Sequence, residues 1–282
     1  MGRKVIFEIA TDNIAGKVNP QCELSILVGM GSLSYCITDA QQQLLLLRDY
    51  DTSDFKVLGE FFLQDEYFRQ SYRAIRIAVA APAFTFLPAR LYNPAEKTTY
   101  LQHLTATDRE MAFRNDDIKT LAATNVYALR RDTVETLQKH LPGARIFHIA
   151  TAITAGLLAH EALAAHTTSL HIHIHEGKLF LLLLHKKELQ FVNVFSYQSA
   201  RDFLYYVMLV FDQFKLDPEE TPAFIAGQLI KDSEIYPLLY RYIRQLQFLP
   251  MPAFIQNGDK LREPHLYFNL FGVTRCGKDV SY

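Results

Sequence analysis

Two stretches of the chain repeat the same pattern of apolar runs and turns. Residues 24–50 read LSILVGMGSLSYCITDAQQQLLLLRDY, and residues 170–197 read LHIHIHEGKLFLLLLHKKELQFVNVFSY. In each stretch a first apolar run leads to a glycine, Gly31 or Gly177, a second run follows it, and a third run comes after a short polar break. Short apolar runs bounded by turn residues are typical of buried strands. The repeat therefore predicts two similar three-stranded meanders within one duplicated fold.

Each repeat is followed by an apolar stretch with helical spacing that opens on an aspartate and a phenylalanine. The pairs are Asp54-Phe55 and Asp202-Phe203. Thr52 or Ser53 can cap the first helix, and a carboxylate in the first turn favours the positive end of the helix dipole. Strands and helices alternate along the rest of the chain. This alternation predicts an α/β protein with mixed sheets covered on both faces.

The individual elements follow from apolar periodicity and turn residues. Strands are expected at 24–29, 33–38, 43–49, 74–80, 84–88, 125–129, 144–150, 169–175, 178–184, 188–195 and 223–226, with a last strand-like run at 265–271. Helices are expected near 55–68, 95–105, 132–141, 151–165, 199–215 and 232–246. Residues 1–20 are interpreted as an irregular lead-in, and the polar stretch 104–119 as a solvated loop.

The composition indicates a folded protein with a large core and no nucleic-acid partner. Of 282 residues, 49% are hydrophobic and 21% are charged, and the formal net charge is −1. This balance lacks the basic excess that binds a phosphate backbone. The cysteines Cys22, Cys36 and Cys276 are too few and too scattered for a disulfide framework or a zinc ribbon. They are typical of buried thiols in a reducing compartment.

The sequence predicts neither a secretory signal nor a membrane span. The first residues, MGRKVIFEIATDN, contain no uninterrupted apolar stretch of signal-peptide length. Elsewhere no apolar run reaches the ~18–20 residues that a membrane-spanning helix needs. We therefore expect a cytoplasmic protein without a membrane partner.

Three alternating histidines, His171, His173 and His175, are the strongest candidate metal ligands. Alternation places all three side chains on one face of a strand, with neighbours about 6.6 Å apart along it. Histidines separated by one residue bind zinc in other proteins, and His185, at the far end of the next strand, can face the start of the first. The sequence identifies no third or fourth ligand elsewhere, so the alternative is a histidine face that is solvated or packs against a helix.

Two other stretches have both a functional and a structural interpretation. GVTRCGKD at 272–279 fits the spacing of a phosphate-binding loop, but Asp279 occupies the position of the Ser or Thr that holds magnesium. We interpret this match as a coincidence in a C-terminal tail. FLYYVMLVF at 203–211 is apolar on every side of a helix, which is typical of a buried helix. The alternative is a surface for a partner or for a homodimer.

The repeated arrangement of three strands, a helix, a strand and a helix resembles the actin-like ATPase fold, a duplicated ribonuclease H-like fold. More closely, LSILVGMGSLSYCITD, RDFLYYVMLVFDQFKLDPEE and FIAGQL resemble an uncharacterised bacterial family of unknown function, DUF3822, over about residues 22–271. The resemblance implies two lobes, each with a mixed sheet flanked by helices. The lobes are expected at 21–165 and 166–271, after the lead-in at 1–20 and before a tail at 272–282.

The resemblance also implies where a nucleotide would bind. Active actin-like ATPases hold phosphates and magnesium in two hairpin turns, each with an aspartate at the end of the first strand. Aligned on Gly31 and Gly177, those positions fall on Gly29 and His175, which do not supply the hard oxygen ligands that magnesium prefers. ATP hydrolysis by that mechanism is not expected, and no cofactor is assigned. The cleft positions that the resemblance implies are Gly29, Gly31, Ser32, Ser34, His175, Gly177 and Gly227, the last from a partial match to an adenosine-binding glycine pair.

The leading hypothesis is a non-catalytic actin-like scaffold that acts through an unidentified protein partner, with a homodimer as a further expectation. The alternative is a protein that binds a nucleotide or another small ligand in the cleft between the lobes, with ATP–Mg²⁺ as the ligand to test. A third hypothesis is a metal-dependent enzyme centred on His171, His173 and His175. The sequence assigns no catalytic residue.

Overall fold

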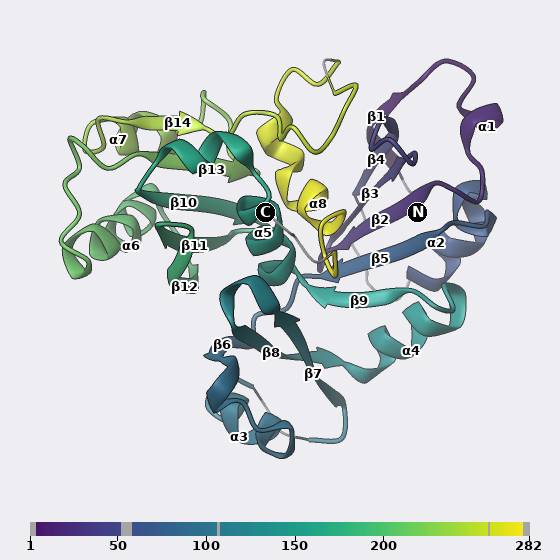
Figure 1. The fold of residues 1–282 in the computed structure, drawn as a ribbon, viewed down its shortest axis with the longest axis horizontal. Coiled ribbons are helices and arrows are strands. Elements are labelled where there is room, and N and C mark those ends of the chain that lie inside the picture. Colours follow the sequence, from purple (N-terminus) through teal and green to yellow (C-terminus); the bar gives the residue numbers. More distant parts are fainter. Residues whose placement is uncertain (1–3, 52–57, 106–107, 259, 279–282) are drawn as a thin grey trace. The chain divides into compact units, whose positions relative to one another are not determined.

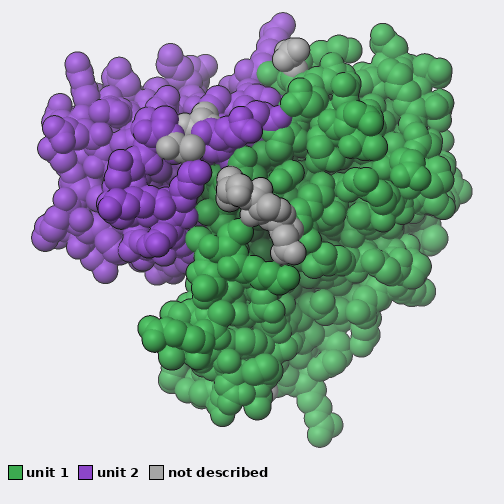
Figure 2. Space-filling model, viewed as in Figure 1, with its two compact units in different colours: residues 1–159, 254–261, 270–282 green, residues 160–253, 262–269 purple. Residues whose placement is uncertain are grey.

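The computed structural model of this chain describes residues 4–51, 58–105, 108–258 and 260–278. The chain divides into two compact units, which Figure 2 colours separately. Unit 1 comprises residues 1–159, 254–261 and 270–282, and unit 2 comprises residues 160–253 and 262–269. The chain therefore returns to unit 1 after it has formed most of unit 2.

Six strands build the main sheet of unit 1: β1 (Lys4–Ala10), β2 (Glu23–Val28), β3 (Ser32–Thr38), β4 (Leu44–Asp51), β5 (Ala74–Val79) and β9 (Arg145–His148). Their order is β1-β4-β3-β2-β5-β9 (Figure 1). β2, β5 and β9 are parallel, and the other neighbours are antiparallel. Every residue of β2 is buried, as its continuous apolar run predicts for a central strand covered on both faces.

Five strands build the sheet of unit 2: β10 (Thr168–His175), β11 (Lys178–His185), β12 (Glu188–Ser196), β13 (Ala223–Gly227) and β14 (Leu246–Phe248). Their order is β12-β11-β10-β13-β14, with β10, β13 and β14 parallel and the other pairs antiparallel. This order matches β4-β3-β2-β5-β9 of unit 1 strand for strand. The duplication predicted from the two sequence repeats is thus confirmed.

The helices connect and cover these strands. The α-helices are α1 (Ile14–Lys17), α2 (Leu58–Gln64), α3 (Lys97–Leu101), α4 (Arg131–His140), α5 (Ile149–Leu158), α6 (Ala200–Gln213), α7 (Ile235–Tyr240) and α8 (Phe268–Val273). Short 3₁₀ helices are η2 (Glu66–Arg69), η3 (Ala89–Leu91), η4 (Pro94–Glu96), η5 (Lys119–Leu121), η6 (Glu161–Ala165) and η7 (Pro264–Tyr267). No helix in the described part of the chain is long and apolar enough to cross a membrane.

A second, three-stranded sheet is inserted in unit 1 between β5 and α4. Its strands are β6 (Phe84–Pro88), β7 (Met111–Ile118) and β8 (Ala123–Arg130), in the antiparallel order β6-β8-β7. β7 corrects the expectation of a solvated loop over 104–119. Two acidic residues of this strand bond to protein groups: buried Asp116 accepts a hydrogen bond from Tyr127 at 3.0 Å, and Asp117 accepts one from Thr124 at 2.9 Å.

Three other expectations also differ from the structure. Lys4–Ala10 does not form an irregular lead-in, because it pairs with β4 as the edge strand β1. The apolar run 265–271 is helical instead of extended, since Pro264 occupies the first turn of η7, where its fixed φ favours a helical start. The helix expected over 232–246 ends at Tyr240, and Leu246–Phe248 pairs with β13 as β14. The expected cap residues Thr52 and Ser53, and the pair Asp54-Phe55, lie outside the described residues.

α6 is buried on one face only, although its sequence is apolar all round. Ser199 caps the helix, and its side chain accepts a hydrogen bond from the Asp202 N–H at 3.1 Å. Phe203 and Phe211 lie in the core of unit 2. On the other side, the Tyr205 side chain is 61% exposed. Because Tyr205 is exposed, the interpretation of α6 as a surface for a partner stays a prediction.

A buried cluster of charges joins the first residues of β2 and β5 to residues 276–278. The Glu23 carboxylate accepts hydrogen bonds from Arg76 Nη1 at 3.0 Å and from Lys278 Nζ at 2.7 Å, and it forms a third ion pair with Arg73. Arg76 also donates from Nε to the Cys276 carbonyl at 2.9 Å. Burial alone would raise the pKa of Glu23, but the hydrogen bonds from Lys278 and Arg73 and the charge of Arg76 lower it to about 2.

Gly227 is required by the close approach of β13 to β10. Its φ is +82°, and a Cβ there would lie 1.9 Å from the Ile174 carbonyl oxygen. We expect Gly227→Ala to lower the free energy of unfolding by at least about 3 kcal/mol. Gly143 has a φ of +81° with no atom within 4 Å of its Cβ position, so Gly143→Ala should cost only about 1 kcal/mol. Urea unfolding compares the two variants, and equal losses would contradict the steric explanation.

The charge cluster predicts a pH-dependent contribution from Glu23. Because its pKa falls from 4.5 to about 2 on folding, its stabilisation is present above pH 4.5 and is lost as the pH falls towards 2. Glu23→Gln should lower the free energy of unfolding by about 3 kcal/mol at pH 7 and by much less at pH 3. Urea unfolding at both pH values measures this, with exposed Glu188→Gln as the control. A loss of equal size at both pH values would show that ion pairing is not the cause.

Candidate functional site

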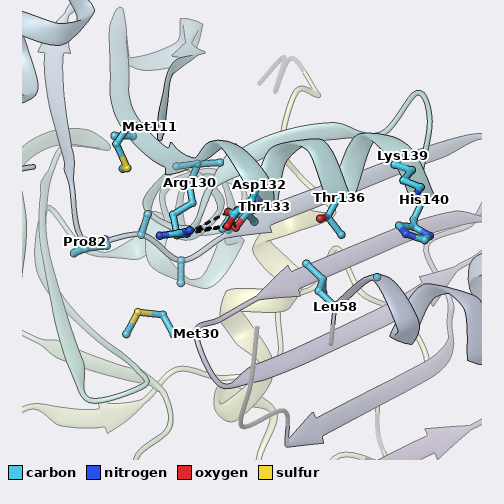
Figure 3. A pocket seen from close by; sticks show the side chains of 16 residues that line it. Met30, Leu58, Pro82, Met111, Arg130, Asp132, Thr133, Thr136, Lys139 and His140 are labelled. Atoms are coloured by element: carbon cyan, nitrogen blue, oxygen red, sulfur yellow. Dashed lines mark hydrogen bonds and ion pairs between the residues drawn. The ribbon is translucent and has the colours of Figure 1, made fainter. Parts of the chain in front are cut away.

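Unit 1 contains a cavity of about 750 Å³ beside the C-terminal end of β5. Residues of α2, α4, the turn between β2 and β3, and the three-stranded sheet line it together with the end of β5 (Figure 3). We call it the β5 cavity. Cavities of roughly 300–1,000 Å³ are large enough to enclose a small ligand or several side chains of a partner.

The floor of the β5 cavity is apolar because small apolar residues follow the last residue of β5. The Ala80 N–H donates to the Val28 carbonyl at 2.8 Å, which extends the parallel pairing of β5 with β2 by one residue. Ala81 follows, and Pro82, which has no N–H, cannot continue the ladder. Alanine and proline side chains fill little volume, so the space above the end of the strand stays open.

Two methionines and a leucine extend the apolar lining. Met30 lies in the turn between β2 and β3 and is 57% exposed, Met111 is the first residue of β7, and Leu58 is the first residue of α2. Figure 3 shows Met30 and Leu58 across the cavity from α4. Methionine side chains are flexible and polarisable, so they adapt to apolar groups of different shapes.

α4 supplies the polar side of the cavity. Arg130, the N-cap residue of α4, donates to Asp132 Oδ2 at 2.6 Å, and this hydrogen bond lowers the pKa of the Asp132 carboxyl. Both side chains are exposed, so the ion pair contributes little to stability. Further along the helix, Thr136, Lys139 and His140 line the same side (Figure 3).

Close packing of α2 against α4 fixes this polar side. A Cβ at Gly59 would lie 3.1 Å from His140 Nε2, so the glycine allows the two helices to approach. The rings of Phe62 and His140 lie 5.9 Å apart in a tilted arrangement. The apolar and polar sides of the β5 cavity are therefore held at a fixed separation by side-chain contacts within unit 1.

The β5 cavity joins an apolar floor to a polar rim. Among its described residues, the rim carries one ammonium group, one imidazole, two threonine hydroxyls and the Arg130–Asp132 ion pair. Apolar anchors surrounded by polar groups are typical of surfaces that bind a segment of another protein. Across the described ranges, no group of three or more His, Cys, Asp or Glu side chains is placed to hold a metal ion.

The cleft positions that the sequence implied in unit 1 lie in or beside the turn after β2. The Gly29 N–H donates to the Ser32 carbonyl at 2.9 Å and closes the turn that contains Gly31. Ser34 lies within β3, and its hydroxyl donates to Asp49 Oδ1 at 2.8 Å. Gly29 has no side chain, so this position offers no carboxylate to magnesium. A role for these residues in binding a nucleotide stays a prediction.

The corresponding positions in unit 2 are brought together by β10 and β13. Glu176 and Gly177, with φ values of 47° and 70°, form the two-residue turn between β10 and β11. Gly227 pairs with Ile174 in the parallel ladder. The two backbones approach so closely that only glycine fits, and this explains the residue without any role in ligand binding. His175 is buried, and burial lowers its pKa, so the imidazole is neutral at pH 7. Its place in a ligand site also stays a prediction.

All three candidate metal ligands of β10 are buried and packed among protein groups. His171 Nε2 lies 2.8 Å from Ser169 Oγ, and His173 Nδ1 lies 2.8 Å from Asn269 Oδ1. Burial lowers the pKa of His173 to about 4, so this ring is neutral at physiological pH. His185 Nδ1 lies 2.8 Å from the Thr168 hydroxyl at the opposite end of β10. The metal hypothesis is not tested by these contacts and stays a prediction.

Sequence reasoning did not identify the β5 cavity. Two signals for it were present: an apolar Met30 between two glycines in a turn, and an amphipathic helix with Lys139 and His140 in its last turn. Neither signal shows that the end of β5 lies beside the inserted sheet. That proximity is a long-range contact, and local periodicity reports only which face of an element is apolar.

Comparisons with known proteins identify the fold and the family. A solved Bacteroides thetaiotaomicron VPI-5482 protein, described as having an actin-like ATPase fold and unknown function, is 18% identical, with a TM-score of 0.73 and coverage of 89% of this chain and 97% of that chain. A type IV pilus biogenesis complex, PilM–PilN, matches with 13% identity, a TM-score of 0.60 and coverage of 91% and 97%. The ethanolamine utilization protein EutJ from Carboxydothermus hydrogenoformans matches with 8% identity, a TM-score of 0.50 and coverage of 92% and 91%.

These structural similarities, together with the repeated sheet order, confirm the predicted two-lobed actin-like ATPase fold. No curated protein matches the sequence. The family model described as "Protein of unknown function (DUF3822)" matches residues 12–246, which is most of the chain. The chain therefore belongs to the DUF3822 family of proteins of unknown function.

Proposed function

We propose that this protein is a non-catalytic scaffold that binds an apolar segment of a partner protein in the β5 cavity. The observation that carries the proposal is the cavity itself, with a volume of about 750 Å³, an apolar floor and a polar rim. Burial of apolar side chains contributes roughly 25 cal/mol per Å² of surface removed from water. Two or three apolar side chains of a partner would thus supply most of the binding free energy.

The exposed Met30 side chain supports a partner of variable shape rather than a rigid substrate. It is 57% exposed in the free chain, and a second methionine, Met111, lies on the wall formed by the inserted sheet. Flexible thioether side chains of this kind are common at surfaces that accept different apolar sequences. Lys139 and the threonine hydroxyls can bond to the main chain or to acidic side chains that flank the apolar segment.

The residues at the two hairpin turns support a non-catalytic role. Phosphoryl transfer in this fold is expected to need carboxylates that hold magnesium. Glycine stands at the first of these positions, Gly29, and a buried neutral imidazole stands at the second, His175. The same fold occurs in a protein solved in complex with a protein partner, PilM with PilN. A cytoplasmic location and a homodimer stay predictions.

Site-specific crosslinking tests the proposed site. A photoreactive phenylalanine analogue at Met30 is expected to capture a defined partner in the native host, whereas the same analogue at Leu91 is expected not to. Leu91, in η3, is the matched control because it is 60% exposed and does not line the cavity. Mass spectrometry of the crosslinked peptides identifies the bound segment. Identical crosslinks at both positions would contradict the assignment of the β5 cavity.

Charge insertion then measures the contribution of the apolar floor. Met30→Asp should weaken binding of the identified segment at least tenfold, because an acidic group would have to lose its hydration against apolar surface. Leu91→Asp should leave the affinity unchanged. Both side chains are exposed, so both variants should unfold at the same urea concentration as the unaltered protein. Fluorescence anisotropy with the labelled segment gives the affinities, and equal affinities for both variants would overturn the proposal.

The scaffold role also predicts that the protein does not hydrolyse ATP. With ATP and Mg²⁺ in millimolar amounts, phosphate release should not exceed that of a buffer control, because Gly29 and His175 supply no carboxylate to magnesium. A phosphate-release assay across a gel-filtration profile measures this, with an active heat-shock chaperone of the same fold class as the positive control. Magnesium-dependent release that follows the protein peak would contradict the non-catalytic role.

A further inference from the structure

A second cavity, of about 670 Å³, lies elsewhere in unit 1, and the described residues that line it are all different from those that line the β5 cavity. It is formed where β7, β9 and α5 meet residues 275–278. Among the residues that the structure describes, five positive side chains and two carboxylates line it: Arg114, Lys119, Arg145, Arg275 and Lys278, with Asp116 and Asp117. These described lining residues carry an excess of three positive charges in a chain whose formal net charge is −1. We call it the cationic cavity.

Both carboxylates of the cationic cavity are bonded to groups of unit 1 other than its cations. Asp116 accepts hydrogen bonds from the His148 N–H at 2.8 Å and from the Thr151 hydroxyl at 2.7 Å. Asp117 accepts one from the Thr124 hydroxyl at 2.9 Å. These neutral donors hold the carboxylates in place between the inserted sheet and α5. The carboxylate oxygens thus accept hydrogen bonds from these backbone and hydroxyl groups.

Arg145 is held in position by a backbone carbonyl and an aromatic ring. Arg145 Nη1 donates to the Gly277 carbonyl at 3.3 Å, and its guanidinium lies 5.1 Å from the centre of the Phe147 ring. Arg114 Nε is buried and forms no hydrogen bond within the described residues. Lys278 is already paired with Glu23 at 2.7 Å, so it contributes to the field of the cavity more than to direct contacts.

One wall of the cationic cavity is apolar. Ile118, Ile146 and Leu158 contribute to it, and all three are buried or nearly buried side chains. A volume of about 670 Å³ is much larger than one inorganic anion requires. The cavity therefore has room for an anionic group beside the arginines and for an organic group against the apolar wall.

We propose that the cationic cavity binds a phosphate-bearing organic molecule, with its phosphate beside Arg114 and Arg145 and its organic part against Ile118 and Leu158. Phosphate fits this lining better than a carboxylate does. A phosphate dianion offers several oxygens to planar guanidinium groups, which bind it through paired hydrogen bonds. Even with Lys278 paired to Glu23, the described lining holds more positive side chains than a single carboxylate neutralises. This binding is independent of a partner segment in the β5 cavity.

Calorimetric titration with phenyl phosphate tests the proposal, because this probe joins a phosphate to a small apolar ring. We expect saturable binding to the full chain that is tighter than binding of inorganic phosphate, since the ring can bury apolar surface against the wall. Arg145→Gln should weaken binding of phenyl phosphate at least tenfold. Arg145 is exposed, so the substitution should leave the fold intact, and the unfolding midpoint in urea checks this.

Arg241→Gln is the matched control, because Arg241 is exposed and lies outside both cavities. It should bind phenyl phosphate as the unaltered protein does, at matched ionic strength. Three results would overturn the proposal: no saturable binding of phenyl phosphate, equal weakening in both variants, or equal affinities for phenyl phosphate and inorganic phosphate. The last result would reduce the site to one for a simple anion.

Discussion

The Glu23 carboxylate holds together three parts of unit 1 that are far apart in sequence. A buried carboxylate is costly unless positive groups compensate it, and here Arg73 and Arg76 come from the start of β5 while Lys278 comes from the end of the described chain. The cluster fixes the pairing of β2 with β5. It also anchors residues 275–278, which line the cationic cavity. The Glu23 charge therefore stabilises both the central strand pair and the residues that line the cationic cavity.

The two units share one sheet order, and both cavities lie where unit 1 departs from it. In unit 1 the chain between β5 and α4 forms a three-stranded sheet, whereas in unit 2 the described residues between β13 and α7 form no strand. The inserted sheet contributes Met111 to the β5 cavity and Arg114 to the cationic cavity. Strands of the repeated fold form one side of each cavity, and the inserted sheet forms another side.

The sequence predicted the repeated strands and helices well because local apolar patterns determine them. Apolar runs around Gly31 and Gly177 located both meanders, and Ser199 was correctly placed at the start of α6. It failed where long-range partners decide the structure. β7 looked like a solvated loop because its polar residues are satisfied by Tyr127 and Thr124, which no local pattern reveals. The β5 cavity was missed for the same reason, since its walls meet only in three dimensions.

The anchoring of residues 276–278 has a consequence for synthesis of the chain. Lys278 and Glu23 are separated by 255 positions, and the Arg76 contact to the Cys276 carbonyl spans 200 positions. Domains generally fold as the chain emerges from the ribosome, N-terminal parts first. Unit 1 cannot complete its charge cluster until residues 160–253 of unit 2 have already emerged. Unit 1 is thus the first unit to be synthesised and the last to complete its contacts. The ion pair between Glu23 and Lys278 cannot form while unit 2 is being translated.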